Sequence, residues 1–153
     1  MTTVAAVSWN DARAYLAWLD RTGRLPGARL CTEHEWERAA RGADDRIYPH
    51  GRRLAPDDAN HDATYGRQPD AYGPDEVGAH PITRSPYGVE DMVGNVWEWT
   101  ESVQRPGEPS VRGGSYYQEE FSDRATNRDV GEADARDPLV GFRVCAAPPS
   151  HPR

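Results

Sequence analysis

Hydrophobic residues near the start of the chain recur at the spacing of an amphipathic helix. Ser8 stands before them as a typical N-cap, with Asp11 at the third helical position. Gly23 follows as a stop signal, so the pattern predicts a first helix between Ser8 and Gly23. The apolar face of this helix consists of Ala12, Tyr15, Leu16 and Leu19.

A second helical pattern begins shortly afterwards. Thr32 and Glu35 have the spacing of a capping box, in which the N-cap side chain and the third helical residue each accept a backbone hydrogen bond. Gly42 marks the expected end of this helix. The predicted buried face consists of Trp36, Ala39 and Ala40.

The segment from residue 43 to residue 90 has no sustained hydrophobic period and is rich in Pro, Asp, Asn and Gly. A structureless loop of this length is unusual in a compact domain. We expect metal ions or aromatic side chains to hold it in place, since its aromatic content argues against disorder. The expected aromatic anchors are Tyr48, Tyr65, Tyr72 and Tyr87.

Alternation typical of a strand returns at residues 96–100. It places Trp97 and Trp99 on one face of the strand and Glu98 on the other. Residues 111–115 predict a short strand that is broken by glycines, and residues 140–146 predict a final strand.

Composition narrows the class of protein. The 153 residues are enough for one domain, and the formal net charge of −7 comes without a basic stripe, which argues against nucleic-acid binding. No apolar run approaches the roughly 20 residues of a membrane span, and no signal peptide is recognisable, so we expect a cytoplasmic protein. Cys31 and Cys145 could form one disulfide or remain two buried thiols.

Six motifs occur in an order that resembles the family of formylglycine-generating enzymes and sulfatase-modifying factors. The resemblance spans residues 7–146, although Cys31 stands where a proline is usual and His50 where a tryptophan is usual. In chain order the motifs are residues 7–12 (VSWNDA), 29–37 (RLCTEHEWE), 48–51 (YPHG), 87–99 (YGVEDMVGNVWEW), 112–115 (RGGS) and 141–143 (GFR).

The resemblance implies an α+β, C-type-lectin-like fold with two helices, small antiparallel sheets and much irregular loop. Residues 1–153 would form a single such domain. Family members usually have a further N-terminal segment that contributes strands, and residues 1–153 begin almost at the first helix. A partner chain or another domain could take the place of that segment.

The resemblance also bears on catalysis. The family's best-known enzyme oxidises a cysteine to formylglycine with copper, which two cysteines hold shortly after the Gly-Gly-Ser motif. By spacing, Gln118 and Asp123 occupy those two positions. Neither side chain replaces a thiolate, the soft ligand that Cu(I) requires, so we expect no copper and no formylglycine-generating activity.

Calcium is the metal that the resemblance favours, as a structural ion held by oxygen ligands. Two sets of ligands are expected. The first set comprises Asn60, the His61 carbonyl, Asp70 and the Tyr72 carbonyl. The second comprises Gly94, Asn95, Val96 and Glu98, with Glu98 as the charged ligand. The alternative for the second set is that Asn95 caps a turn and Glu98 pairs with an arginine.

The segment before the final strand is where C-type-lectin-like folds often bind ligands. Its aromatic and short polar residues are typical of adaptable binding surfaces. Variable proteins of diversity-generating retroelements carry their mutable residues between the same two flanking motifs. The expected ligand-binding residues are Tyr116, Tyr117, Gln118, Glu119, Phe121, Asp123 and Asn127.

Three functional classes remain open: a non-catalytic domain that binds an unknown protein or small ligand, a cysteine-independent oxidase-like enzyme, and a structural domain that stabilises an assembly. The alternative interpretation of the 116–137 segment is that it belongs to the interior, with its tyrosines packed in the core. The arginines Arg124, Arg128 and Arg143 would then form internal salt bridges.

Overall fold

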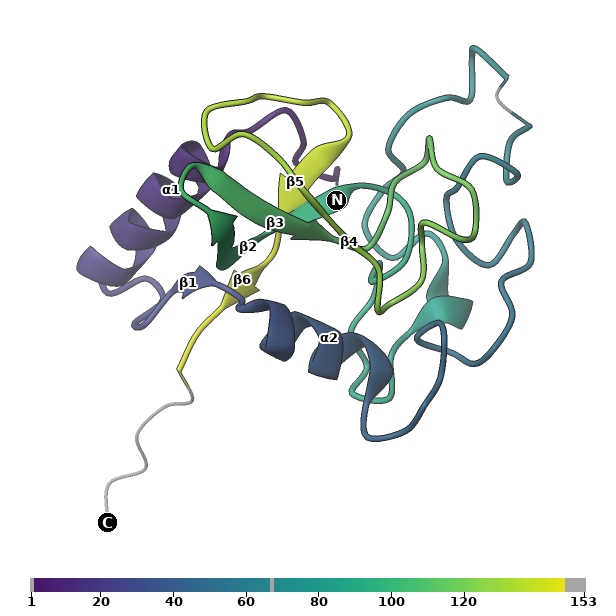
Figure 1. Ribbon diagram of the computed structural model, residues 1–153, viewed down its shortest axis with the longest axis horizontal. Coiled ribbons are helices and arrows are strands. Elements are labelled where there is room, and N and C mark those ends of the chain that lie inside the picture. The colour runs from purple at the N-terminus through teal and green to yellow at the C-terminus, as the bar shows by residue number, and fades with distance from the viewer. Residues whose placement is uncertain (1, 67, 148–153) are drawn as a thin grey trace.

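The computed structural model describes residues 2–66 and 68–147. Both predicted helices are present, and each begins with the predicted capping box: Ser8 with Asp11, and Thr32 with Glu35. The elements, shown in Figure 1, are α1 (Trp9–Arg21), β1 (Arg29–Leu30), α2 (Glu33–Arg41), the short 3₁₀ helix η1 (Pro81–Thr83), β2 (Trp97–Arg105), β3 (Glu108–Arg112), β4 (Arg128–Val130), β5 (Val140–Phe142) and β6 (Val144–Cys145).

The strands form two sheets. The larger has the order β4-β3-β2-β5, and β1 pairs with β6 in the smaller. The small sheets are antiparallel as expected, except that β5 runs parallel to β2 at one edge of the larger sheet. A hairpin joins β2 to β3, whereas the chain after β4 crosses to the opposite edge before it enters β5.

The predicted strands differ from the observed ones at their ends. The strand expected at residues 96–100 continues to Arg105, and the one expected at 111–115 is the end of β3. Gly113 and Gly114 both have positive φ and turn the chain out of the sheet. Arg143 interrupts the expected final strand, so that β5 pairs with β2 and β6 pairs with β1.

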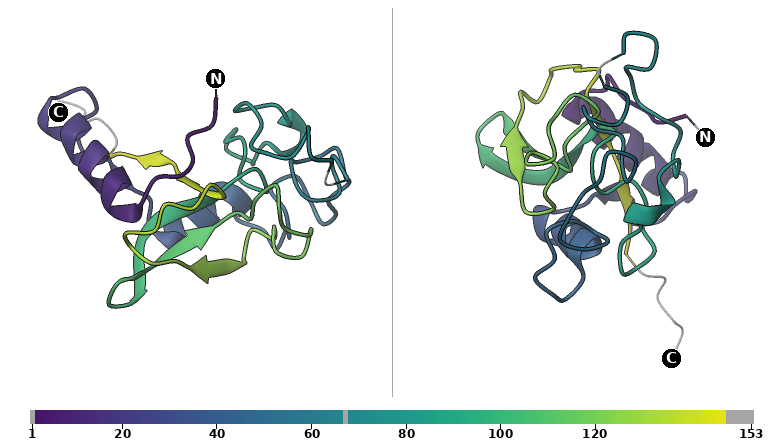
Figure 2. Two further views of the ribbon diagram at one scale, coloured as in Figure 1. Left: turned by 90° about the horizontal axis from the view of Figure 1, so that it is seen from above. Right: turned by 90° about the vertical axis from the view of Figure 1, so that its right-hand side faces the viewer.

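Three hydrophobic clusters fill the interior. One packs α1 against Trp97 and Trp99 of β2, and a second surrounds Trp36 of α2. The third, which contains Tyr48, lies beneath the long irregular segment. Figure 2 shows this segment at the opposite end of the molecule from α1, with the larger sheet between them.

The long segment is thus ordered around its own small core, and two of the four expected aromatic anchors make contacts that hold it. Tyr48 is 3 % exposed within this core, and the Tyr72 ring packs edge-on against Tyr116. Tyr65 and Tyr87 lie at the surface. Small and aliphatic neighbours complete the core. These are Leu54, Ala59 and Val93.

A disulfide joins Cys31 to Cys145, with a Cα–Cα distance of 5.0 Å. It links the start of α2 to β6, across 114 residues of sequence. Closing a loop of this length stabilises the folded state by about 4–5 kcal/mol in the chain-entropy model. Of the two alternatives for Cys31 and Cys145, the structure thus contains the disulfide and not two free thiols.

Glu98 lies at the centre of a buried polar group. Its carboxylate accepts a hydrogen bond of 2.6 Å from Trp36 Nε1 and two, of 2.6 and 2.7 Å, from Arg143. Burial lowers the pKa of Arg143, but the charge and hydrogen bonds of Glu98 raise it above its ordinary value. Arg143 also donates to the backbone carbonyls of Glu90 and Asp91, so one ion pair connects α2, β2, the β5–β6 junction and the end of the long segment.

The internal salt bridge expected for Arg143 is confirmed, because it pairs with the buried Glu98. Arg128 pairs with Glu33 at 3.7 Å, but its side chain is 58 % exposed, so this salt bridge lies at the surface and not in the interior. The expectation is wrong for Arg124, whose guanidinium instead stacks over the Phe121 ring at 4.3 Å.

No helix within the described part of the chain is both long enough and apolar enough to cross a lipid bilayer.

Candidate binding site

The segment that follows β3 is a series of turns attached to the sheet at Ser115. The backbone N–H of Tyr116 donates to the carbonyl of Asn95 at 3.0 Å, and Ser115 Oγ donates to Gln118 Oε1. Ser115 is fully buried, so its hydroxyl holds the first turn closed from inside. The turns that carry the expected ligand-binding residues are therefore firmly attached to the sheet at their N-terminal end.

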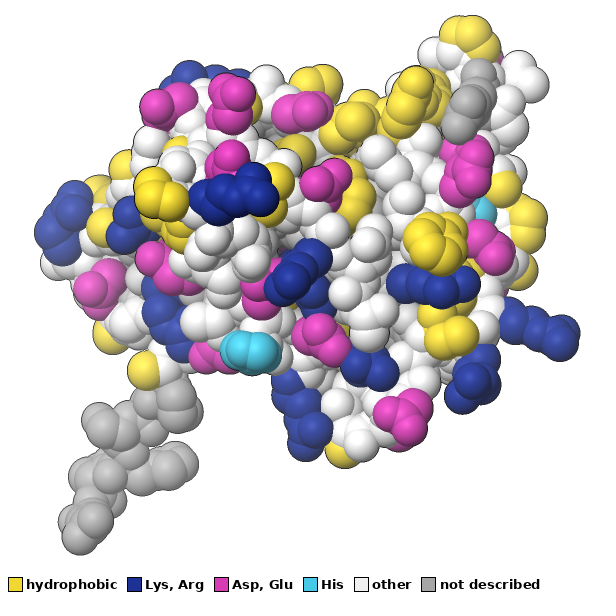
Figure 3. All heavy atoms as spheres, in the orientation of Figure 1, with side chains coloured by type: hydrophobic (Ala, Val, Ile, Leu, Met, Phe, Trp, Pro, Cys, Tyr) yellow, Lys and Arg dark blue, Asp and Glu magenta, His cyan; other side chains and the backbone are white. Residues whose placement is uncertain are grey.

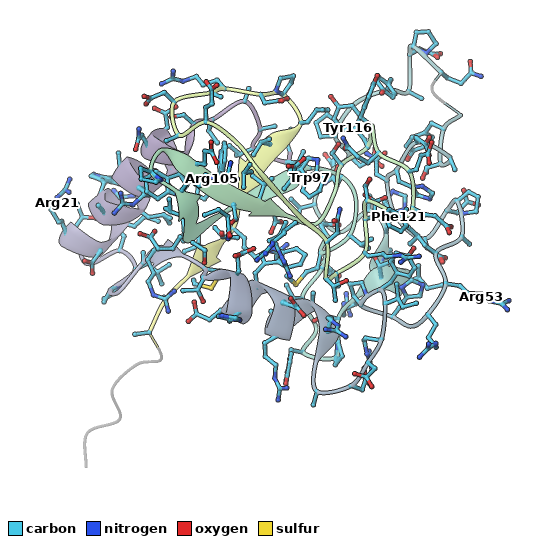
Figure 4. All side chains as sticks on the ribbon, viewed as in Figure 1. Arg21, Arg53, Trp97, Arg105, Tyr116 and Phe121 are labelled. Atoms are coloured by element: carbon cyan, nitrogen blue, oxygen red, sulfur yellow. A yellow bond between two sulfur atoms is a disulfide. The ribbon has the colours of Figure 1, made fainter. Side chains whose placement is uncertain are left out.

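Aromatic side chains from two distant parts of the chain meet on this segment. Tyr72 of the long irregular segment packs edge-on against Tyr116 at 5.2 Å and against Tyr117 at 5.6 Å between ring centroids. Tyr117 and Phe121 are 48 % and 63 % exposed, whereas Tyr116 is nearly buried. Figure 4 shows Tyr116 and Phe121 on the same side of the larger sheet. This surface supplies large, semi-rigid contact area.

Asp123 lies inside the molecule. Its side chain is 0 % exposed, and neither carboxyl oxygen has a hydrogen-bond partner among the described residues. It packs against the backbone of Gly114, where an added Cβ would lie 1.8 Å from Asp123 Oδ1. Burial, followed by the negative charges of Asp62 and Glu120, raises the pKa of Asp123 from 3.8 to about 9. The group is therefore a neutral acid at neutral pH.

Gln118 faces different surroundings. It lines a cavity of about 200 Å³ together with the two buried tryptophans of β2 and the segment that leads into β5. Asp123 is not among the residues around this cavity. The two positions that carry cysteines in the resembled enzyme are thus an amide at a small cavity and an uncharged buried acid. Neither offers a soft ligand.

The remaining predicted residues divide between surface and interior. Glu119 is exposed. Asn127 donates to the carbonyl of Ser122 at 2.8 Å and closes a turn. Tyr72 was expected as an aromatic anchor of the long segment and as a carbonyl ligand of calcium, but not as part of this surface. The cavity residues Asp137 and Leu139 were also missed, because the parallel pairing of β5 that brings them there was not foreseen.

The first predicted calcium set is partly brought together. Asn60 and His61 are buried, and Asn60 Nδ2 donates to the carbonyl of Gly73 at 2.8 Å, next to Tyr72. Asp70 and Tyr72 lie at the surface. This set includes one carboxylate and several carbonyl oxygens, which is the chemistry that calcium takes.

The second set does not fit a cation in this arrangement. Both carboxylate oxygens of Glu98 are bound by Arg143 and Trp36, as in the alternative in which Glu98 pairs with an arginine. Asn95 Oδ1 instead accepts from the backbone N–H of Asp75 and from Asn60 Nδ2. Across residues 2–66 and 68–147, no three His, Cys, Asp or Glu side chains gather in an arrangement that could hold a metal. Calcium binding stays a prediction.

The buried acid predicts an unusual dependence of stability on pH. The unfolded chain releases the Asp123 proton near its ordinary pKa of 3.8, and the folded chain keeps it until about pH 9. The free energy of unfolding of the wild type should therefore fall as pH rises between these values, by at most ~1.4 kcal/mol per pH unit. Asp123→Asn should flatten this slope and be more stable than the wild type at pH 8, as measured by urea denaturation.

The control for this measurement is Asp57→Asn, which changes an exposed carboxyl of the long segment and should keep the wild-type slope. Identical pH profiles for the wild type and Asp123→Asn would contradict a buried, protonated Asp123.

Calcium binding predicts a shift in thermal stability. Millimolar calcium should raise the melting temperature and EDTA should lower it, because a bound ion stabilises only the folded state. Asp70→Asn removes the exposed carboxylate of the first set and should abolish the calcium-dependent shift without changing the melting temperature in EDTA. Differential scanning calorimetry measures both. A melting temperature insensitive to calcium and to EDTA would eliminate both sets.

Comparison with known proteins agrees with this geometry. The model of the sulfatase-modifying factor enzyme 1-like domain matches residues 2–148. Inactive C-alpha-formylglycine-generating enzyme 2 of Bos taurus is 36% identical over 165 residues, which cover 97% of this chain and 51% of that protein. Formylglycine-generating enzyme of Bos taurus is 32% identical over 170 residues, covering 94% of this chain and 43% of the enzyme. The chain thus spans about half the length of these relatives.

Two further comparisons extend the picture. Hercynine oxygenase of Mycolicibacterium smegmatis is 42% identical over 104 residues, which cover 67% of this chain and 22% of the enzyme. The solved structure of Treponema denticola variable protein 1 has a TM-score of 0.81 at 21% identity, covering 95% of this chain and 71% of its own. The α+β, C-type-lectin-like fold is therefore confirmed. The chain belongs to the sulfatase-modifying factor enzyme 1-like family.

Proposed function

We propose that this chain is a non-catalytic domain that binds a protein or small ligand through the turns of residues 115–127. The observation that carries this proposal is the chemistry at the two cysteine positions. Gln118 is tied to Ser115, and Asp123 is buried as a neutral acid. A copper-dependent oxidation needs thiolates at these positions, and the structure offers an amide and a carboxylic acid.

The exposed aromatic side chains support recognition at the same place. Tyr117 and Phe121 stand at the surface beside Tyr72, on turns attached to a rigid sheet. Tyrosine and phenylalanine contribute large contact areas at a low cost in conformational entropy. The relative that is called inactive is also a precedent within the family for a member without formylglycine-generating activity.

A more specific form of the proposal is a variable protein of a diversity-generating retroelement. The fold shared with Treponema denticola variable protein 1 supports it, and so does the position of the aromatic turns between the Gly-Gly-Ser and Gly-Phe-Arg motifs. The second candidate is a cysteine-independent oxidase-like enzyme. The similarity to hercynine oxygenase over two thirds of the chain favours it. A cytoplasmic location and a partner chain or domain beside the sheet remain predictions.

Binding through the aromatic turns can be tested without knowing the natural ligand. A random peptide library displayed on phage is selected on the immobilised domain, and the enriched peptides are measured against variants. Tyr117→Ala/Phe121→Ala should weaken their binding by about 30-fold or more, because a single aromatic anchor at a binding hot spot already contributes ~2 kcal/mol or more. Fluorescence polarisation with labelled peptides measures the affinities.

The matched control is Ile82→Ala/Tyr87→Ala, which removes two side chains of similar exposure, 60% and 57%, from the 81–88 segment. It should leave the affinities unchanged. Selection of no peptide, or of peptides that lose equal affinity in both double variants, would contradict a recognition surface at residues 115–127.

A further inference from the structure

A second cavity, of about 330 Å³, lies between the residues that follow the Tyr48 turn and the part of the 115–127 turns that contains Glu120. Three arginines line it: Arg52, Arg53 and Arg124. Figure 3 shows a group of dark-blue side chains on the right-hand side of the molecule, and Figure 4 places Arg53 and Phe121 on that side. Glu120 is the one carboxylate at the cavity, which leaves a formal charge of +2 among these residues.

These three arginines differ from most others in the chain. All 18 basic residues are arginines, against 25 acidic residues. Most arginines elsewhere in the described chain pair with carboxylates, such as Arg46 with Asp44 and Arg143 with Glu98. No salt bridge in the described part of the chain involves the arginines of the cavity. Like charges so close together repel, and an anion between them would remove that repulsion.

The backbone holds the first two arginines in place. Tyr48 and Gly51 exchange backbone hydrogen bonds of 2.9 and 3.1 Å in a tight turn, directly before Arg52. Leu54, directly after Arg53, is 7% exposed and packs into the cluster around Tyr48. Arg52 and Arg53 therefore lie on a two-residue span that is fixed at both ends, which lowers the entropy lost when they bind.

Arg124 is also fixed before any ligand arrives. Its guanidinium stacks over the Phe121 ring at 4.3 Å, and its Nε atom is buried without a hydrogen-bond partner. The backbone N–H of Ala125 donates to the Ile47 carbonyl at 3.0 Å and joins this turn to the Tyr48 turn. The stacked guanidinium lines the cavity, so Arg124 loses little conformational freedom when it binds an anion there.

We propose that this cavity binds a tetrahedral oxyanion, a phosphate or sulfate group that is either free or carried as a monoester. Guanidinium groups from two segments suit an anion with three or four acceptor oxygens better than a planar carboxylate, which one arginine fork satisfies. The net charge of −7 opposes long-range attraction of anions, so binding depends on these short-range hydrogen bonds. The site shares Glu120 and Arg124 with the 115–127 turns, but it does not depend on the function proposed for them.

The test is a titration of the ¹⁵N-labelled domain with sodium sulfate, inorganic phosphate and phenyl phosphate at constant ionic strength. The Nε–Hε signals of Arg52, Arg53 and Arg124 should shift together and saturate. Arg52→Gln/Arg53→Gln should weaken binding about tenfold or more, whereas Glu120→Gln should strengthen it several-fold. Tighter binding of phenyl phosphate would identify an ester as the ligand, and equal binding would identify the free anion.

Arg21→Gln/Arg24→Gln is the matched control, since it changes the net charge equally at the end of α1, and Figure 4 shows Arg21 at the opposite side of the molecule from Arg53. It should leave the affinity unchanged. Shifts that do not saturate, that spread over all arginine signals, or that weaken equally in both double variants would overturn the proposal. Circular dichroism confirms folding, which the exposed Arg52 and Arg53 should not affect.

Discussion

The ion pair of Glu98 with Arg143 is the constraint on which the other elements depend. Glu98 is 6% exposed; the Arg143 guanidinium balances its charge, and the Trp36 indole N–H donates a further hydrogen bond to it. Removing one partner of a buried pair typically costs 3–5 kcal/mol, because the other charge is left unpaired. Through this pair the second helix, the central strand and the junction of the last two strands hold one arrangement. The turns of residues 115–127 project from that arrangement.

The pair also shows how far the sequence predicts the structure. The helices follow from local signals, because a capping box and a helical period involve residues only a few positions apart. Glu98 opposite the two tryptophans follows from strand alternation. Its partner does not, since several arginines were equal candidates, and only the break of the final strand at Arg143 brings that guanidinium to it.

The candidate site was less predictable for the same physical reason. The turns of residues 115–127 follow from the flanking motifs, but the burial of Asp123 depends on its close approach to Gly114, a contact across a turn. Tyr72 reaches the surface from a segment with no periodicity at all. Tertiary packing determines which polar residues are buried, and the local sequence pattern does not predict this.

Taken together, the fold retains the scaffold of its family while the chemistry at one location differs. The residues that identify the family build the core, the caps and the central ion pair. The two positions where soft ligands would be needed hold an amide and an uncharged acid. The shared fold therefore does not imply a shared function, because the same scaffold can present different side chains on its turns.

The most direct test of this account is an oxidation assay with a cysteine-containing peptide, copper(I) and oxygen, followed by mass spectrometry. Formylglycine-generating enzyme of Bos taurus serves as the positive control. The account predicts that no formylglycine forms on the peptide in the presence of this domain. Conversion of the cysteine to an aldehyde by the domain would contradict it.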